Sequence, residues 1–401
     1  MKKLGYRHTV NAAFGGYIVQ ALLNNFLPLL FVRFHAEFGI SFAELSLLVL
    51  LNFVVQIGVD ALSPILAVYL GYRRAVYLAN LAAILGLCGL AAFPTLFCSP
   101  FLGLLLSVLL YALGSGIIEV VISGIIESIP SENKHAAMSL LHSFYCWGVC
   151  LVVLLSTLFF ATVGVAHWRL LTLLWAILPL CDLVYFTRVD IPSPAADKAG
   201  GVTLGRLFSR RVFWVFFVMM ICAGACEQAI VQWVSAYAEL ALGLQKTVGD
   251  LFGPLGFAVF MGLSRVIFAR RAGKLRLRRY MLFSALLCLA GYLCAALCPI
   301  AWLSLFGCIL CGFAVGILWP GTYSLAAERL RGGTLMFACL ALAGDLGCTG
   351  GPSAVGFITD AFSGNMRLGI LLSIVFPIGM LVALTILDHM KSEEEYHASR
   401  K

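Results

Sequence analysis

The sequence predicts an all-α membrane protein in which twelve transmembrane helices form two pseudo-symmetric halves of six helices each. Three observations carry this prediction: the chain is very apolar, its apolar stretches number twelve, and its two halves repeat. Of the 401 residues, 62% are hydrophobic and 11% are charged, whereas charged residues make up about 25% of a soluble domain. Soluble enzymes, nucleic-acid-binding proteins and disordered chains are excluded, because such a core would lack a polar shell.

The apolar stretches define the expected spans and domains. A membrane-crossing helix needs about 20 mostly apolar residues, and polar residues or Pro and Gly end each stretch. The stretch between the sixth and seventh spans is charged and rich in Pro and Gly, so we expect an N-terminal half over 1–187, a linker over 188–211 and a C-terminal half with a short tail over 212–401. The twelve expected spans are 12–34, 43–69, 75–94, 101–126, 137–163, 168–187, 212–240, 250–269, 280–299, 301–327, 335–362 and 366–389.

The basic residues orient these spans. Of the 27 Lys and Arg residues, 22 lie on the side of the N-terminus, and Arg265 lies inside the eighth span. Because Lys and Arg concentrate in cytoplasmic loops, we expect a multi-pass protein of the cell membrane with both termini and the linker in the cytoplasm. The net charge of +8 is then explained by the membrane topology, and the expected partner is the lipid bilayer. A nucleic-acid partner is not expected. The four basic residues on the opposite side are Arg33, Arg169, Lys246 and Arg367.

The two halves share short patterns at nearly constant offsets. Arg73-Arg74 and Pro94 bound the third span as Arg278-Arg279 and Pro299 bound the ninth, at an offset of 205. The strings VQA at 19–21 and EQA at 227–229, and GII at 116–118 and GIL at 316–318, recur at offsets of 208 and 200. Three matches in order favour a duplication of six spans, and an even number of spans gives both halves the same orientation.

Cofactors and metals are not expected. The chain has 14 cysteines, most of which lie inside apolar stretches, where Cys acts as a small hydrophobic residue. Cys308 and Cys311 form a CxxC pair, but the sequence offers no second pair and no nearby His to complete a zinc site. A phosphate-binding loop is also missing, so coupling to ATP by this chain is not expected.

Polar residues inside the expected spans are the candidate functional residues, because an ionisable side chain in the membrane needs a partner or a water-filled cavity. Amides at helical spacing form stripes: Gln20 with Asn24 in the first span, Asn52 with Gln56 in the second, and Gln228 with Gln232 in the seventh. Their occurrence in both halves favours a central cavity. The alternative is that these amides are hydrogen-bonded between neighbouring helices.

Glu119 is the strongest single candidate. It lies in GSGIIEVVISG, without a basic residue within one turn, and Trp319 occupies the equivalent position of the other half. Burial among Ile and Val disfavours the charged form, so Glu119 is the expected proton carrier of the first half, and Glu227 that of the second. The alternative is a neutral structural carboxyl. Arg265, with Asp345 as its candidate partner, is expected to act in gating, and Asp60 is expected to be structural.

Two residues of the fifth span, His142 and Tyr145, lie three positions apart, and Trp147 follows. Such an aromatic stripe is commonly packing, and a stacking face for a sugar ring is the alternative.

At these residues the sequence resembles the fucose–proton symporter family of the major facilitator superfamily. The carrying segments are GSGIIEVV with Glu119, AGACEQAIVQWVSAY with Gly224, Glu227, Trp233 and Tyr237, and GILWPGTYSLA with Trp319, Pro320 and Tyr323. The resemblance implies the major facilitator fold, alternating access and a solute site at the membrane midplane between the halves. Two departures stand out: Pro28 occupies the place of the family's first-span acid, and the loop signature that implies gating is reduced to Gly71-Tyr72-Arg73-Arg74.

The expected function is secondary active transport of a small polar solute, most plausibly a sugar, with the proton as the candidate coupling ion and a monomer as the expected state. An efflux pump for an amphipathic compound and a non-transporting membrane sensor are the alternatives; an enzyme is not expected. The candidates for proton coupling are Glu119 and Glu227, and those for gating are Arg265, Asp345, Arg73 and Arg74. The expected solute-binding residues are Gln20, Asn24, Asn25, Gln56, Glu119, His142, Tyr145, Glu227, Gln228, Gln232, Trp233 and Trp319.

Overall fold

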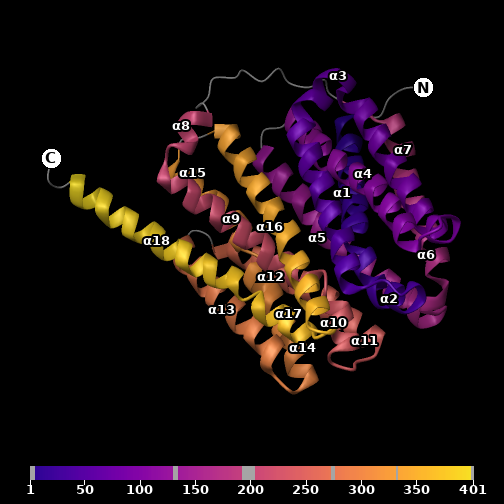
Figure 1. Cartoon of the computed structure of the whole chain (residues 1–401). Helices are drawn as coiled ribbons and strands as arrows, with labels where there is room; N and C mark the ends of the chain where they lie inside the picture. Colours follow the sequence, from indigo (N-terminus) through magenta and orange to yellow (C-terminus); the bar gives the residue numbers. More distant parts are fainter. Residues whose placement is uncertain (1–4, 130–133, 192–203, 272–275, 331–332, 399–401) are drawn as a thin grey trace. The chain divides into compact units, whose positions relative to one another are not determined.

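The structure of the chain is a computed structural model that describes residues 5–129, 134–191, 204–271, 276–330 and 333–398. All its described elements are helical (Figure 1), which confirms the all-α prediction. The chain separates into two compact units. Unit 1 comprises Met1–Asp197 with Gln245–Leu251, and unit 2 comprises Lys198–Leu244 with Phe252–Lys401. Residues 192–203, half of the linker expected at 188–211, are outside the described residues.

Unit 1 holds the first six spans. α3 packs along α4, and α1 packs against α4, α5 and α7. The polar side chains of α1 therefore face three other helices of the same unit. The elements are α1 (Tyr6–Asn25), η1 (Leu27–Leu30), α2 (Phe31–Phe38), α3 (Phe42–Leu96), α4 (Pro100–Ser128), α5 (Lys134–Thr162), η2 (Val165–His167), α6 (Trp168–Trp175), α7 (Ile177–Arg188) and, from later in the chain, α11 (Lys246–Asp250).

Unit 2 holds the remaining helices. α9 packs along α16 and α18, and α14 packs against α12 and α13. The elements are α8 (Leu204–Phe208), α9 (Arg211–Val231), α10 (Val234–Leu240), η3 (Leu251–Leu255), α12 (Gly256–Arg271), α13 (Leu277–Leu297), α14 (Ala301–Val315), α15 (Leu318–Arg329), α16 (Gly333–Ala361), α17 (Met366–Leu372) and α18 (Val375–Ala398).

Glycine and proline explain where the helices break. α3 contains both the second and third expected spans, and they meet at Gly71, whose φ of 69° and ψ of 157° are non-helical. A positive φ favours glycine because it has no Cβ. Pro28 lies in the short 3₁₀ turn η1 that interrupts the first span. α3 starts at a capping box, in which Ser41 and Glu44 each accept a hydrogen bond from the other's backbone N–H.

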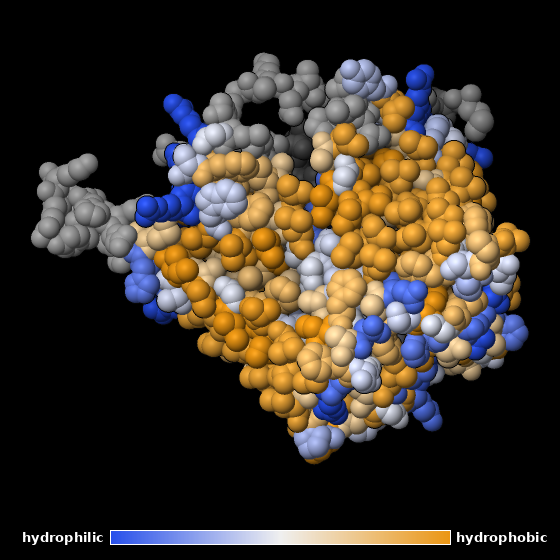
Figure 2. Space-filling view, in the orientation of Figure 1, coloured by the Kyte–Doolittle hydropathy of each residue, from blue (hydrophilic) through white to orange (hydrophobic). Residues whose placement is uncertain are grey.

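The outer surface of each unit is hydrophobic. In Figure 2, broad hydrophobic areas cover the helices, and large exposed side chains include Leu85 and Leu158 in unit 1 and Trp302 and Phe306 in unit 2. In water such surfaces would drive association, whereas in lipid they are the expected exterior.

Eleven segments of the described chain are helical, long and apolar enough to cross a membrane. They correspond to eleven of the twelve expected spans. The remaining expected span lies in α16, a continuous helix of 29 residues.

Candidate functional site

An amide cluster in unit 1 joins α1, α3 and α4. Asn24 is its centre: its Oδ1 accepts hydrogen bonds from Ser115 Oγ at 3.0 Å, Gln56 Nε2 at 3.2 Å and Asn52 Nδ2 at 3.4 Å. Its own Nδ2 donates to Gln56 Oε1 at 3.3 Å. Asn24, Asn52 and Gln56 are all at most 6% exposed. In the conformation described, the stripes on the first two spans therefore bond to each other, which is the helix-joining alternative for these amides.

Next to this cluster, Gln20 holds the Glu119 carboxyl. Gln20 Nε2 on α1 donates to Glu119 Oε2 on α4 at 2.6 Å. Gln20 is 4% exposed, whereas Glu119 is partly exposed. Among the described residues, Gln20 Oε1 is buried without a hydrogen-bond partner. A proton on Glu119 would turn one of its oxygens into a donor, so the amide oxygen of Gln20 is a natural acceptor for it.

The aromatic candidates of α5 lie beside α1. Asn25 Nδ2 donates to Tyr145 Oη at 3.1 Å and to Ala21 O at 2.9 Å. The ring of His142 is exposed and meets Tyr17 edge-on, with centroids 5.4 Å apart. His142 and Tyr145 thus belong to the same side of unit 1 as the amides of α1.

In unit 2, three predicted residues of α9 and its C-terminal end form a hydrogen-bonded chain. Gln232 Nε2 donates to Gln228 Oε1 at 3.0 Å, and Gln228 Nε2 donates to Glu227 Oε1 at 3.3 Å. The other oxygen, Glu227 Oε2, lies 3.9 Å from Arg265 Nη2 on α12. These contacts link the candidate proton carrier Glu227 to the candidate gating residue Arg265 within unit 2.

Pro320 explains a second contact of Arg265. A proline lacks the N–H that would bond the carbonyl four residues earlier, which for Pro320 is the carbonyl of Gly316. Helix α14 ends at Val315, and Arg265 Nε donates to Gly316 O at 3.2 Å. The broken span therefore supplies an acceptor for this arginine. The expected pairing of Arg265 with Asp345 stays a prediction.

The two candidate tryptophans differ in their surroundings. Trp233 is fully buried, and its Nε1 donates to Pro352 O at 2.9 Å, so it packs in the interior in this conformation. Trp319 is partly exposed, and a Cβ on Gly344 of α16 would collide with its ring. The outer edge of the Trp319 ring thus lies against Gly344 of α16, and the role of Trp319 in solute binding stays a prediction.

The comparisons with known proteins now identify the family. The sequence model of the Major Facilitator Superfamily matches residues 11–352. The chain belongs to the Major Facilitator Superfamily. Members of this superfamily are transporters, so the chain is a membrane transporter with the twelve-helix, two-half fold. An uncharacterised transporter of this superfamily from Yersinia pestis is 24% identical over 358 residues, which are 88% of this chain and 87% of the relative.

Solved structures share the superfamily fold. The xylose transporter of E. coli, in a partially occluded inward-open form, aligns with a TM-score of 0.75 at 13% identity over 95% of this chain and 98% of its own. A bacterial homologue of the human lysosomal transporter Spinster gives 0.73 at 13% identity, covering 96% and 97% of the two chains. The fucose:proton symporter of E. coli gives 0.63 at 15% identity, covering 94% and 98%.

In this superfamily member, the candidate gating arginine Arg73 has a visible structural contact. Its guanidinium donates to the carbonyls of Phe186 at 3.2 Å and Val189 at 2.9 Å. A cation at a helix C-terminus satisfies the last carbonyls and favours the helix dipole. Arg73 thus caps α7, while Arg74 is exposed. Gating by either residue stays a prediction.

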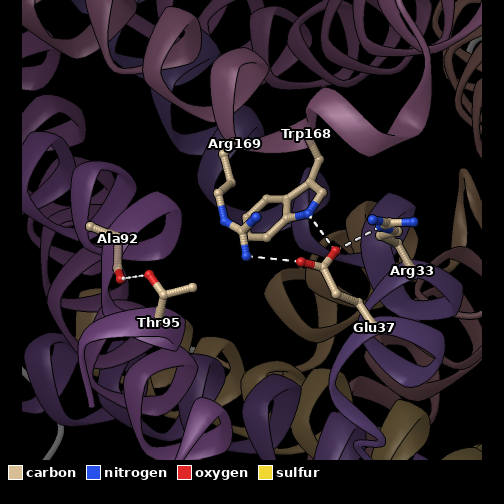
Figure 3. A network of polar contacts seen from close by, with 6 residues as sticks. All are labelled: Arg33, Glu37, Ala92, Thr95, Trp168 and Arg169. Atoms are coloured by element: carbon tan, nitrogen blue, oxygen red, sulfur yellow. Dashed lines mark hydrogen bonds and ion pairs between the residues drawn. The ribbon is translucent and has the colours of Figure 1, made fainter.

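Among the described residues of unit 1, Glu37 is the centre of an ion-pair network. Figure 3 shows Glu37 between Arg33, Trp168 and Arg169. Glu37 Oε2 accepts from Arg33 Nε at 2.7 Å and Trp168 Nε1 at 3.0 Å, and Oε1 accepts from Arg169 at 2.8 Å. Two of the four basic residues that oppose the positive-inside rule, Arg33 and Arg169, are therefore paired with Glu37, and the network joins α2 to α6.

The sequence reasoning missed two buried acids, Asp182 and Asp250. Asp182 on α7 is 5% exposed and accepts a hydrogen bond from Asn80 Nδ2 on α3 at 3.1 Å. The signal was available, because an aspartate stands inside an apolar span in LPLCDLVYF.

Proposed function

We propose that this transporter takes up a small polar solute, a sugar, together with a proton, by alternating access in the cell membrane. The observation that carries the proposal is the Gln20–Glu119 pair. A partly exposed carboxyl in an apolar span, held by an amide at 2.6 Å, can bind and release a proton. An ionisable side chain inside the membrane is costly and commonly marks a proton or substrate pathway.

The sugar is supported by the polar side chains that each unit supplies. Amides and carboxyls that can bond hydroxyl groups accompany partly exposed aromatic rings such as Tyr145 and Trp319, and a ring can stack on a sugar. Structures with the same fold include the fucose:proton symporter and a D-xylose–proton symporter. We propose that the chain works as a monomer, because each unit contains its own candidate carboxyl.

The first prediction concerns coupling. Glu119→Gln keeps the size and hydrogen bonding of the side chain but cannot release a proton. Proteoliposomes with the variant should exchange labelled sugar at a rate close to that of the parent protein, yet lose accumulation driven by an imposed pH gradient. The substrate is first chosen from a panel of fucose, xylose and related monosaccharides by the thermal stabilisation of the purified protein.

Glu328→Gln is the matched control, because Glu328 is an exposed acid on α15; it should leave accumulation unchanged. Accumulation that follows the pH gradient in Glu119→Gln as in the parent would contradict proton coupling by this residue. Stabilisation by an amphipathic compound, with no sugar effective, would favour efflux instead.

A further inference from the structure

A second carboxyl of unit 1, Asp182, lies in a sealed position. Its Oδ1 is 2.8 Å from where a Cβ on Gly15 of α1 would be, and its Oδ2 is 3.6 Å from that of Gly16. Any other residue at Gly15 would collide with the carboxyl. The carboxyl of α7 therefore rests directly on the backbone of α1, where a side chain would otherwise stand.

The amide opposite Asp182 has its donors fully engaged. Asn80 on α3 is 0% exposed. One N–H of its Nδ2 bonds Val76 O at 3.2 Å, and the other bonds Asp182 Oδ2 at 3.1 Å. A primary amide has two donors and one acceptor oxygen. All that Asn80 can still offer is therefore its acceptor, Oδ1.

The pair is left with two acceptors and no donor. Among the described residues, Asp182 Oδ1 and Asn80 Oδ1 are both buried without a hydrogen-bond partner. An ionised Asp182 would leave both oxygens unsatisfied and would bury a charge without a counter-ion, which costs several kcal/mol. A proton on the carboxyl removes the charge and supplies the donor that the pair lacks.

The charged and titratable groups on the neighbouring helices have other contacts. On α3, Arg73 donates to the carbonyls of Phe186 and Val189. On α7, Tyr185 pairs with His8 at 3.0 Å, and on α1, Tyr17 pairs with Ser123 of α4 at 2.7 Å. These contacts give Asp182 no cation, so they do not favour its ionised form.

We propose that Asp182 holds a proton at neutral pH and, as a neutral carboxyl paired with Asn80, clasps α7 to α1 and α3. Glu119 resembles it in pairing with an amide whose oxygen is left over, but Glu119 is partly exposed and Asp182 is sealed. The proton of Asp182 is therefore resident and takes no part in the transport cycle. This inference does not depend on the proposed sugar or on coupling at Glu119.

Infrared spectroscopy tests the proton directly. In the purified parent protein at pH 7, a carbonyl stretching band of a protonated carboxyl should persist, and part of it should keep its frequency in D₂O because the site is sealed. Asp182→Asn should remove that exchange-resistant part. Glu37→Gln is the matched control: Glu37 is ion-paired with two arginines, so its loss should leave the band unchanged.

Transport separates a resident proton from a cycling one. Asp182→Asn can still accept from Asn80 and can donate to its oxygen, so we expect pH-driven accumulation close to that of the parent. An unchanged protonated-carboxyl band in Asp182→Asn would show that Asp182 is ionised and would overturn the proposal. Loss of accumulation in a folded Asp182→Asn protein would overturn the resident role and make Asp182 a coupling residue.

Discussion

The backbone N–H that Pro320 lacks explains one hydrogen bond of Arg265. Pro320 cannot bond the Gly316 carbonyl, and Arg265 Nε takes that place at 3.2 Å while its Nη2 lies 3.9 Å from Glu227. The arginine thus connects the break of the tenth span to the carboxyl of the seventh. We therefore expect the position of Arg265 to depend on Pro320 as well as on Glu227.

A double-mutant cycle tests this dependence. Pro320→Ala returns the N–H, which can compete with Arg265 for the Gly316 carbonyl. Arg265→Gln alone should destabilise unit 2 by about 1–3 kcal/mol, since it removes charge-assisted hydrogen bonds. In the Pro320→Ala background the same change should cost about 1 kcal/mol less, because residues that share a partner are not additive. Thermal unfolding of the four proteins in detergent measures the coupling; strict additivity would show that the two residues act independently.

At the residue scale, the sequence predicted the candidate site residues more readily than it predicted the contacts of their side chains. The spacing placed Gln20 with Asn24 on one face of the first span and Asn52 with Gln56 on one face of the second, and the structure joins Asn24 to Asn52 and Gln56. Periodicity along one helix could not show that Asn24 accepts from α3 and α4 at once, because that depends on the rotation of three helices. The contact of Arg265 with Gly316 needed the same three-dimensional information.

At the scale of the elements, glycines on α16 allow this helix to pack closely against α9. Along α16, a Cβ on Gly347 would collide with the Ile221 carbonyl of α9, and one on Gly351 would lie 2.7 Å from the Ala225 carbonyl. Small residues at such crossings allow backbones to approach closely. Gly347 and Gly351 therefore allow α16 to pack closely against α9.

Two substitutions on α16 test this contact. Gly347→Ala should destabilise unit 2 by about 1–3 kcal/mol, because the new methyl group must displace backbone. Gly350 is the control, since a Cβ there meets no atom within 4 Å; Gly350→Ala should be neutral or stabilise by about 0.5–1 kcal/mol through helix propensity. The unfolding temperatures of both variants in detergent decide the matter. Equal temperatures would mean that α16 and α9 can separate without loss.

The whole molecule has a predicted topology that rests on the distribution of Lys and Arg. In a variant without the native cysteines, Lys198→Cys should react with a membrane-impermeant maleimide only after the cytoplasmic face is opened, because the linker is expected in the cytoplasm. Arg169→Cys should react with the same maleimide in intact cells, because Arg169 is expected on the outer side of the membrane. Labelling of position 198 from outside intact cells would invert the topology.

The class, the number of helices and the repeat could be predicted from the sequence, because hydropathy and internal similarity need no contacts. The breaks were harder to place. From the sequence alone, the proline would place the break of the tenth span at Pro320, yet α14 ends at Val315 and α15 begins at Leu318. A proline disrupts the bonding of the turn before it, so the break precedes the residue that causes it.

The membership of residues Gln245–Leu251 has a consequence for biosynthesis. This segment belongs to unit 1 although α9 and α10 of unit 2 precede it. In it, Lys246 Nζ donates to Leu29 O at 2.6 Å and lies 3.2 Å from Asp250, which also accepts from Thr157 at 3.5 Å. Domains generally fold as they leave the ribosome, N-terminal first. Here unit 1 stays incomplete until translation has passed residue 251. The ends of the first and fifth spans therefore remain without their contacts to this segment while the seventh span is inserted.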